Sequence, residues 1–575
     1  MSEQSAGHLL VQCLIEQGVE VTFGVPGESF LDVLDGFHAF RDRIKFVACR
    51  QEGGAAFMAE AHGKLTRRPG VCIVTRGPGA TNASIGVHTA FQDSTPMILL
   101  VGDVGGDFRD REAFQEVDFA AMFGPNTKGM AKLVERIDRA DRIPEYVQRA
   151  FSTAMSGRPG PVVLVMPEDM LTERTAACPA PRVEPVSPGV AAKDVQSLLA
   201  LLRKAERPLL IAGGGWSASS AQALQRFAER WQLPVGNAFR FQDSFDNHHG
   251  LYAGDIGIGV GPKLAQRVRD SDLIIAVGAR LGEMTTSGYT LLDAPRPRQK
   301  LVHVHSGAEE LYRVYSPDLA INASNASLMD ALAEHSPVGQ VPWKAWADQA
   351  HRDYEAHTSD ARRTSEQIDR DDTARGPIDM AAVVQVVQRL LPADAVVTNG
   401  AGNFASWIHR YFRFHGIAKG VKTQLSPTAG AMGYGVPAGI AANLITGRVA
   451  FTIAGDGDFL MNGQELATAI QYGARSIIVV LNNGIYGTIR MHQERHYPGH
   501  VIGTDLRNPD FVMLAKAYGY VAEKVERTSE FEPALRRALQ SDRGTLIEIP
   551  LSPQMITTGP SLEDIRKDAM KRLCR

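Results

Sequence analysis

Short apolar runs recur along this chain and alternate with longer segments in which apolar residues return every three or four positions. The short runs predict buried strands, and the longer segments predict helices with one apolar face. Strands that alternate with helices in this way are typical of parallel sheets covered by helices on both faces. The pattern therefore predicts an α/β fold with doubly wound parallel sheets.

The strand candidates form three groups, and the stretches between the groups lack this alternation. Residues 178–189 carry four prolines and indicate a linker. Residues 343–375 are highly charged and are interpreted as a solvated, partly helical connector. We predict three domains and a tail, at residues 1–177, 190–336, 377–550 and 551–575. The strand candidates are residues 21–25, 46–49, 71–75, 97–101 and 162–166 in the first domain, 209–212, 273–277 and 301–305 in the second, and 395–398, 449–454 and 476–481 in the third.

Composition and charge narrow the class of protein. The 575 residues are enough for three domains, and the 44% hydrophobic and 22% charged content is ordinary for a globular enzyme. The net charge of −3 gives no sign of nucleic acid or of a membrane surface as partner. Five cysteines without metal-ligand spacing, no signal-peptide pattern and no long apolar span favour a cytoplasmic protein.

Two strand candidates of the third domain end in turns that suit a metal ion and a diphosphate. The run at 449–454 leads into Gly-Asp-Gly-Asp at 455–458, and the run at 476–481 leads to Asn483. Because parallel strands joined by a helix end at the same edge of a sheet, we expect Asp456 and Asn483 to lie close together. A carboxylate and an amide oxygen beside glycines suit Mg²⁺ holding a diphosphate.

The segment between these turns predicts a helix, because Leu460, Leu466, Ala467 and Ile470 mark one apolar face. A GDG turn followed by an Asn-Asn turn in this context resembles the thiamine-diphosphate motif. The chain is identified as a member of the thiamine-diphosphate-dependent 2-oxo acid decarboxylases and carboligases. It resembles acetolactate synthase over most of its length and benzoylformate decarboxylase in the GIYGTIR segment after Asn483.

The resemblance implies thiamine diphosphate and Mg²⁺ as cofactors. It implies that the first domain binds the aminopyrimidine ring and the third domain binds the diphosphate. It also implies a homodimer or homotetramer with active sites between chains, because in the family the two domains of one site come from different chains. Asp456, Asn483 and the carbonyl of Ile485 are the implied metal ligands. The implied cofactor-binding residues are Glu52, Gly402, Asn403, Phe404, Gly430, Met432, Gly455, Asp456, Gly457, Asp458, Phe459, Asn483, Ile485 and Tyr486.

Two of these residues have specific implied roles. Glu52 follows a strand and starts a helix, where an acid is favoured by the helix N-terminus alone. The resemblance instead implies that Glu52 bonds N1′ of the aminopyrimidine and favours its 4′-imino tautomer. Met432, within a Gly-x-Met-Gly context, is ordinary core filler or, by resemblance, the wedge that bends the cofactor. Phe404 stands where acetolactate synthases have histidine, so it supplies no polar side chain.

Substrate-facing residues are expected in the first domain. Glu28 occupies a place where acetolactate synthases have glycine and pyruvate decarboxylases have an acid that handles protons. We therefore predict Glu28 as a catalytic and substrate-facing residue, with a solvent-facing glutamate at a helix start as the alternative. Phe114 and Gln115 match an acetolactate synthase segment that lines the active site of the neighbouring chain, which implies that both face the substrate and that Gln115 is also catalytic. Their alternative is a surface loop.

Glycines after two strands of the second domain, at 213–215 and 278, resemble the flavin region of acetolactate synthase, but a Met-His-Gly segment of that region is absent. FAD therefore stays open as a structural cofactor without redox chemistry. For the whole chain we predict a 2-oxo acid decarboxylase or carboligase. The alternatives are a carbon–carbon lyase or ligase of 2-hydroxyacyl thioesters or hydroxyketones, and an inactive nucleotide-binding homologue.

Overall fold

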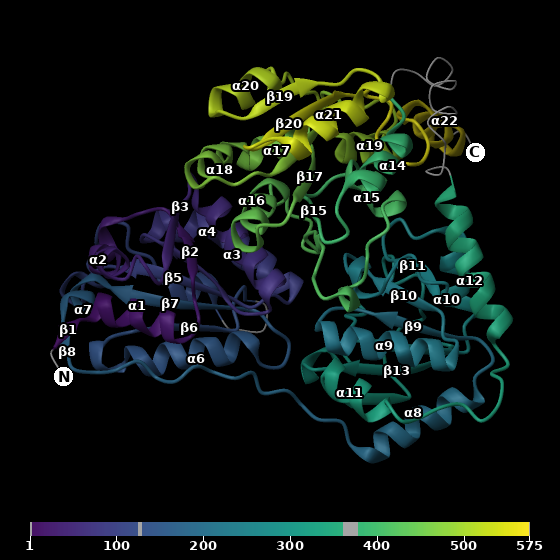
Figure 1. Cartoon of the computed structure of the whole chain (residues 1–575), viewed down its shortest axis with the longest axis horizontal. Coiled ribbons are helices and arrows are strands. Elements are labelled where there is room, and N and C mark those ends of the chain that lie inside the picture. Colours follow the sequence, from purple (N-terminus) through teal and green to yellow (C-terminus); the bar gives the residue numbers. More distant parts are fainter. Residues whose placement is uncertain (1–2, 125–128, 360–377, 574–575) are drawn as a thin grey trace.

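Three parallel sheets, each of six strands with helices packed around them, make up the protein (Figure 1). The computed structural model describes residues 3–124, 129–359 and 378–573. The predicted fold class, three doubly wound parallel-sheet domains, is confirmed. The predicted residue boundaries of the domains stay predictions.

The first sheet has the strand order β3-β2-β4-β5-β7-β6. Its strands at residues 70–74, 97–103 and 161–167 are fully buried, as a parallel sheet covered on both faces requires, whereas the edge strands at 45–48 and 133–136 are partly exposed. The strands are β2 (Val21–Gly24), β3 (Lys45–Ala48), β4 (Gly70–Val74), β5 (Met97–Asp103), β6 (Leu133–Arg136) and β7 (Pro161–Pro167), and the main helices are α1 (Ala6–Glu16), α2 (Leu31–Ala39), α3 (Glu52–Thr66), α4 (Gly77–Asp93), α5 (Phe119–Phe123) and α6 (Ile143–Met155).

The second sheet has the order β11-β10-β9-β12-β13-β14. It lies below the third domain in Figure 1, in teal. Its strands are β9 (Pro208–Ala212), β10 (Val235–Ala238), β11 (Tyr252–Ile256), β12 (Leu273–Val277), β13 (Lys300–His305) and β14 (Leu319–Asn322), and its helices include α8 (Ala192–Lys204), α9 (Ala218–Trp231), α10 (Pro262–Asp270), α11 (Asn325–Leu332) and α12 (Lys344–His357).

The third sheet has the order β16-β15-β17-β18-β20-β19. Its strands are β15 (Val396–Asn399), β16 (Gln424–Leu425), β17 (Ala450–Gly455), β18 (Ile477–Asn482), β19 (Val521–Lys524) and β20 (Thr545–Pro550). Its helices are α14 (Met380–Leu390), α15 (Ala405–Tyr411), α16 (Gly435–Thr446), α17 (Asp456–Asn462), α18 (Leu466–Tyr472), α19 (Gly487–His496), α20 (Phe511–Tyr518) and α21 (Thr528–Gln540), and the tail ends in α22 (Leu562–Leu573).

The strand orders locate the crevices in which such sheets bind ligands. When its strands are counted along the chain, each of the first and third sheets runs 2-1-3-4-6-5, and the second runs 3-2-1-4-5-6. In open parallel sheets, ligands bind beyond the carboxyl ends of the strands where this order reverses direction. Those points lie between β2 and β4, between β9 and β12, and between β15 and β17. Each pair of strands is followed by one of the glycine-rich or charged turns noted in the sequence.

The first and third domains are joined through a buried polar contact between α3 and α16. Glu60 on α3 is fully buried and accepts hydrogen bonds from the Tyr434 hydroxyl at 2.7 Å and the Thr95 hydroxyl at 2.7 Å. Lys64, one turn further along α3, pairs with Glu60 at 3.1 Å. Because a buried acid must be satisfied by partners of this kind, the contact fixes how the two domains meet.

Two predicted features differ from the structure or fall outside it. The single helix predicted after the GDG turn is wrong, since α17 and α18 are separated by a 3₁₀ turn at Gly463–Glu465. The break turns Leu460 and Ile470 out of the predicted apolar face, and both are exposed. The predicted charged connector begins as α12, while its part from residue 360 onward lies outside the described residues. No helix within the described part of the chain is long and apolar enough to cross a membrane.

Candidate active site

A cavity of about 230 Å³ opens at the carboxyl edge of the third sheet, at the point where its strand order reverses. The turns after β15, β17 and β18 form its floor, and Leu551 and Ile556 of the tail add apolar side chains. Twelve residues predicted for cofactor binding line it, namely Gly402, Asn403, Phe404, Gly430, Met432, Gly455, Asp456, Gly457, Asp458, Asn483, Ile485 and Tyr486.

Asp456 presents a buried carboxylate to this cavity. Its Oδ1 accepts a hydrogen bond from the Gly457 amide at 2.9 Å, and its Oδ2 accepts from the Gly484 amide and from Asn508 Nδ2, both at 2.8 Å. Burial raises the pKa of Asp456, and these hydrogen bonds offset only part of the shift. No basic side chain among the described residues pairs with Asp456, so a cation is the partner that would stabilise its charged form.

Asn508 was not singled out in the sequence, and the structure places it behind the metal-ligand candidates. Its Nδ2 donates both to Asp456 and to Asn482 Oδ1, the latter at 2.9 Å. The chain around it is held antiparallel to residues 484–486, because the Tyr486 amide donates to the Thr504 carbonyl at 2.8 Å. An asparagine before Pro-Asp is typical of a turn, so nothing in the sequence pattern distinguishes this one.

Asp458 has a side-chain role that the sequence did not indicate. Its Oδ1 accepts hydrogen bonds from the Gly433 amide at 2.9 Å and the Ala401 amide at 3.1 Å, and its Oδ2 is buried without a partner in the described residues. Burial raises the pKa of Asp458 to about 7. The carboxyl group therefore fastens the loop that carries Met432 to the loop after β15. A Cβ at Gly400 would lie 2.0 Å from Asp458 Oδ1, so only glycine fits there.

The floor of the cavity is formed by close backbone approach. A Cβ at Gly402 or Gly455 would lie within 2.7–2.8 Å of the Phe404 ring. The Phe404 ring thus packs against the glycine turns and, as predicted, offers no polar group to the cavity. The Asn403 amide donates to Thr488 Oγ1 at 3.0 Å, which ties this turn to the start of α19.

Glu52 and Phe459 lie outside the cavity lining. Glu52 begins α3 and accepts a hydrogen bond from Asn82 Nδ2 at 2.9 Å. Phe459 is buried with its ring edge-on to Phe511, so it can reach a ligand only through its backbone. Within one copy of the chain, the structure therefore does not bring Glu52 to the cavity that Asp456 lines.

Glu28 sits at the reversal point of the first sheet and is part of an ion-pair triad. Arg76 Nη1 lies 3.1 Å from Glu28 Oε1, and Arg76 Nη2 pairs with Glu168. The Arg76 side chain is 7% exposed while that of Glu28 is 68% exposed. A buried guanidinium thus anchors an acid whose side chain remains open to solvent.

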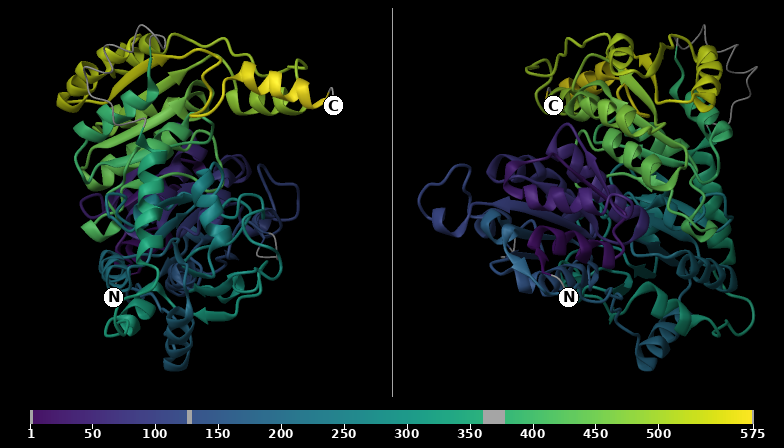
Figure 2. Two further views of the ribbon diagram at one scale, coloured as in Figure 1. Left: turned by 90° about the vertical axis from the view of Figure 1, so that its right-hand side faces the viewer. Right: turned by 60° about the vertical axis from the view of Figure 1, so that its left-hand side comes forward.

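Phe114 and Gln115 belong to a segment between β5 and α5 that stands out from the first domain (Figure 2). Phe114 is 73% exposed, and the Gln115 carbonyl accepts a hydrogen bond from the Gly77 amide at 3.0 Å. Neither residue lines the cavity of the third domain in the same chain. An exposed phenylalanine on a projecting segment is placed to meet another surface.

The residues at the cavity fit a diphosphate held through a divalent metal ion. Asp456 supplies a buried carboxylate without a cationic partner, and Asn483 supplies an amide oxygen on the neighbouring turn. Backbone amides at glycine turns suit diphosphate oxygens. Gly430, at φ +68° with open space where a Cβ would stand, leaves room for a ring beside Met432.

A second, larger cavity of about 550 Å³ lies where the three domains meet. Gly214, Gly215 and Gly278 line it at the reversal point between β9 and β12. Six basic side chains face it against one acid, Asp93. The basic residues are Lys64, Arg67, Arg240, Arg280, Lys422 and Arg448. Lys64, Arg280 and Lys422 already pair with Asp93, Glu310 and Asp243. Arg67, Arg240 and Arg448 are therefore the basic residues of the lining that would favour an anionic ligand.

Comparison with known proteins assigns the chain to a family. Residues 4–122 match the N-terminal TPP binding domain of thiamine pyrophosphate enzymes, residues 195–332 match the central domain, and residues 400–549 match the C-terminal TPP binding domain. The chain is 30% identical to the acetolactate synthase large subunit of Haemophilus influenzae, over 94% of this chain and 92% of the relative. It is 32% identical to the acetolactate synthase large subunit of Parasynechococcus marenigrum, over 95% and 87%, and 30% identical to the isozyme 3 large subunit of Escherichia coli K12, over 94% and 93%.

Proposed function

The chain belongs to the thiamine pyrophosphate enzyme family, and from that premise we propose that it is a Mg²⁺-dependent 2-oxo acid decarboxylase and carboligase that acts like acetolactate synthase. The cavity at the reversal point of the third sheet carries this proposal, because it gathers a buried acid, an amide and glycine turns around one space. Relatives named acetolactate synthase, similar over nearly their whole length, support it.

The third domain holds the cofactor. Asp456, Asn483 and the carbonyl of Ile485 bind Mg²⁺, and the glycine turns after β15 and β17 bind the diphosphate. Bound thiamine diphosphate supplies the carbon centre that adds to the 2-oxo acid and takes up the electron pair released with carbon dioxide. Met432 would lie against the rings of the cofactor, and Leu551 and Ile556 would exclude water from that part of the cavity.

The first domain of a second copy completes the site. Glu52 lies away from the cavity of its own chain, so a partner copy in a homodimer or homotetramer supplies it, as in the family. Glu52 then contacts the aminopyrimidine ring and holds the proton there. Phe114 and Gln115, on their projecting segment, come from the same partner copy, and Glu28 moves a proton at the substrate while Arg76 holds it in place.

Mixing two inactive variants tests this shared site. Glu52→Gln and Asp456→Asn chains, each inactive alone, are co-expressed in equal amounts. If each site takes Glu52 from one chain and Asp456 from the other, half of the chains form hybrid dimers with one intact site, and about a quarter of wild-type activity returns. No recovery of activity in verified hybrids would show that one chain supplies both residues.

The second cavity holds a nucleotide such as FAD in a structural role, since its volume, glycine turns and excess of basic side chains suit a diphosphate with attached rings. Decarboxylation and carboligation need no redox step. The absorption spectrum of the purified protein, before and after denaturation, tests this directly. A colourless protein that takes up no flavin but binds ADP would assign the cavity to an adenine nucleotide.

The substrate is tested with a panel of 2-oxo acids. Steady release of carbon dioxide with a 2-hydroxyketone or aldehyde product is expected when thiamine diphosphate and Mg²⁺ are present. Cofactor binding without carbon dioxide release would favour a lyase or ligase of 2-hydroxyacyl thioesters. Ile556 lines the cavity and α22 packs on α19, so the tail covers one side of the site in either case. Failure to bind thiamine diphosphate at all would leave an inactive homologue.

A further inference from the structure

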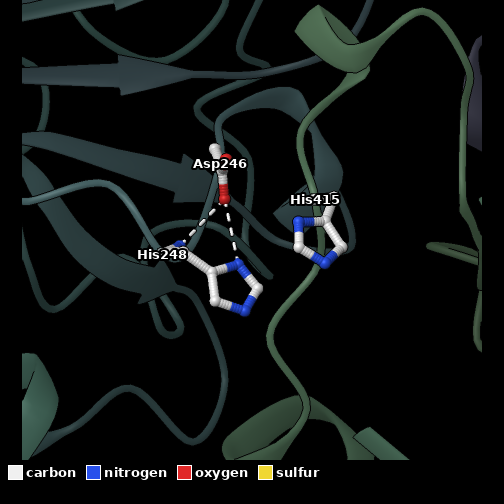
Figure 3. Close-up of side chains that lie close together, drawn as sticks. All are labelled: Asp246, His248 and His415. Atoms are coloured by element: carbon white, nitrogen blue, oxygen red, sulfur yellow. Dashed lines mark hydrogen bonds and ion pairs between the residues drawn. The ribbon is translucent and has the colours of Figure 1, made fainter. Parts of the chain in front are cut away.

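A cluster of metal-binding side chains lies between the second and third domains and lines neither of the cavities described above (Figure 3). Asp246 and His248 come from the loop between β10 and β11, and His415 comes from the loop after α15. One ligand atom from each of the three side chains lies within 4.8 Å of the other two. We propose that Asp246, His248 and His415 bind a divalent transition metal ion such as Zn²⁺ and thereby cross-link the two domains.

The two loops are fixed against each other by the residues next to these three. Asn247, between Asp246 and His248, is fully buried, and its amide donates to the Phe414 carbonyl at 3.0 Å. In return the Phe414 amide donates to Asn247 Oδ1 at 3.0 Å, which places His415, the next residue, beside the acid. A Cβ at Gly416 would lie 2.6 Å from the Asp246 amide nitrogen, so the backbones approach closely. The ligands are therefore preorganised by buried contacts rather than carried on free loops.

The three side chains converge on one point, and a small rotation would bring them onto one ion. Asp246 Oδ1 is hydrogen-bonded to His248 Nδ1 at 3.0 Å and accepts from the His248 amide at 2.9 Å, so a metal ion would replace the first of these bonds. The rings of His248 and His415 are stacked, with centroids 4.3 Å apart and planes at 11°. Because imidazole binds a metal in its own ring plane, one of the two rings must turn, and His248 is exposed enough to do so. Within the described part of the chain the His415 ring has no hydrogen-bond partner, so its nitrogens are available.

The chemistry selects a transition metal rather than Mg²⁺ or Ca²⁺. Two imidazoles and one carboxylate suit Zn²⁺, Ni²⁺ or Cu²⁺, whereas Mg²⁺ and Ca²⁺ prefer oxygen ligands alone. Lys419 Nζ, 3.9 Å from Asp246 Oδ2, is the competing cation, and its side chain is 62% exposed and free to move.

Metal titration of the whole protein tests the proposal. Chelator-treated enzyme, saturated with thiamine diphosphate and Mg²⁺ so that the other metal site is filled, is titrated with Zn²⁺ against a chromophoric chelator. We expect about one Zn²⁺ per chain. We also expect His415→Ala and His248→Ala each to lower the Zn²⁺ affinity at least about tenfold, because mutation of residues that merely support metal ligands already lowers metal affinity by roughly 10–100-fold. His249→Ala is the matched control, because that ring bonds Glu229 at 3.0 Å instead.

The rival site is the pair His492 and His496 on α19, whose rings are also parallel, with centroids 6.2 Å apart. His492→Ala removes it. Zn²⁺ binding that His492→Ala abolishes and His415→Ala leaves intact would overturn the proposal, as would a wild-type protein that takes up no Zn²⁺. Melting curves of the metal-free variants show whether each is folded. If His415→Ala is not folded, the Zn²⁺ affinity of His248→Ala decides, because His248 is exposed and its replacement leaves the fold intact.

Discussion

Asn508 gives the sharpest test of how the metal site is built. Asn508→Ala removes the amide that donates to Asp456 Oδ2 at 2.8 Å and to Asn482 Oδ1 at 2.9 Å. The carboxylate then keeps only the Gly484 amide on that oxygen. The Gly457 and Gly484 amides still hold the carboxylate, but its orientation toward the cavity is less firmly fixed without the side-chain donor, so part of the free energy of metal binding is spent on ordering it.

The expected magnitude follows from the type of bond lost. A hydrogen bond to a charged group contributes about 1.5–3 kcal/mol. Because about 1.4 kcal/mol is a factor of ten in an equilibrium constant, this corresponds to a loss of roughly 10–100-fold in Mg²⁺ affinity, the range found when supporting residues of metal sites are removed. The effect on cofactor binding should vanish when Mg²⁺ is in large excess.

The assay is calorimetric titration of Mg²⁺ in the presence of thiamine diphosphate, with the circular dichroism of the bound cofactor as a second readout. Asp505→Asn is the matched control, since it lies on the same segment, is exposed and pairs with Arg490 rather than Asp456. Equal or tighter Mg²⁺ binding by a folded Asn508→Ala protein would refute the reasoning. It would mean that Asn508 competes with the metal for Asp456.

Three further outcomes are expected. Glu52→Gln should bind thiamine diphosphate within about threefold of wild type but slow exchange of the cofactor's C2 hydrogen by ~10²–10⁴-fold, and unchanged exchange, followed by magnetic resonance, would contradict the role of Glu52. Asp255, whose pKa burial raises to about 8, favours the protonated folded state, so its contribution to stability is full below about pH 4 and is lost as the pH rises to about 8. Asp255→Asn should therefore flatten the fall in melting temperature over that window, and an unchanged slope would show that the group does not titrate there. Gly400→Ala forces a methyl group against Asp458 and should destabilise the protein by about 1–3 kcal/mol, whereas Gly282→Ala, with open space, should change the melting temperature little; equal melting temperatures would argue against the steric reading.

The sequence predicted the architecture well where strands are uniformly apolar. β12 lies at the residues predicted for it, and β7 and β17 are shifted or extended by only one residue at their ends. The edge strands β6 and β14 gave no signal, because they are half buried and carry charged or polar residues. β10 was missed because a glycine and an asparagine interrupt it.

The candidate site, too, could be predicted only in part from the sequence. Residues adjacent to the Gly-Asp-Gly-Asp and Asn-Asn turns gather at one cavity, because local motifs on neighbouring strands share a sheet edge. Their binding roles stay predictions. Asn508 and the bond from Asp458 to Gly433 could not be predicted, since both join positions that are distant along the chain and carry ordinary turn residues. The exposure of Leu460 reflects a break in a helix that periodicity alone does not reveal.

The division of the site between two sheets has a consequence for how such a protein changes over time. The residues that line the candidate cofactor cavity follow strands of the third sheet, while Glu28, Phe114 and Gln115 belong to loops of the first. Mutations in those first-domain loops leave the third-domain residues around the cavity unchanged. If the proposed roles hold, substrate preference can change in evolution through the loops of one domain while the other domain keeps its cofactor site.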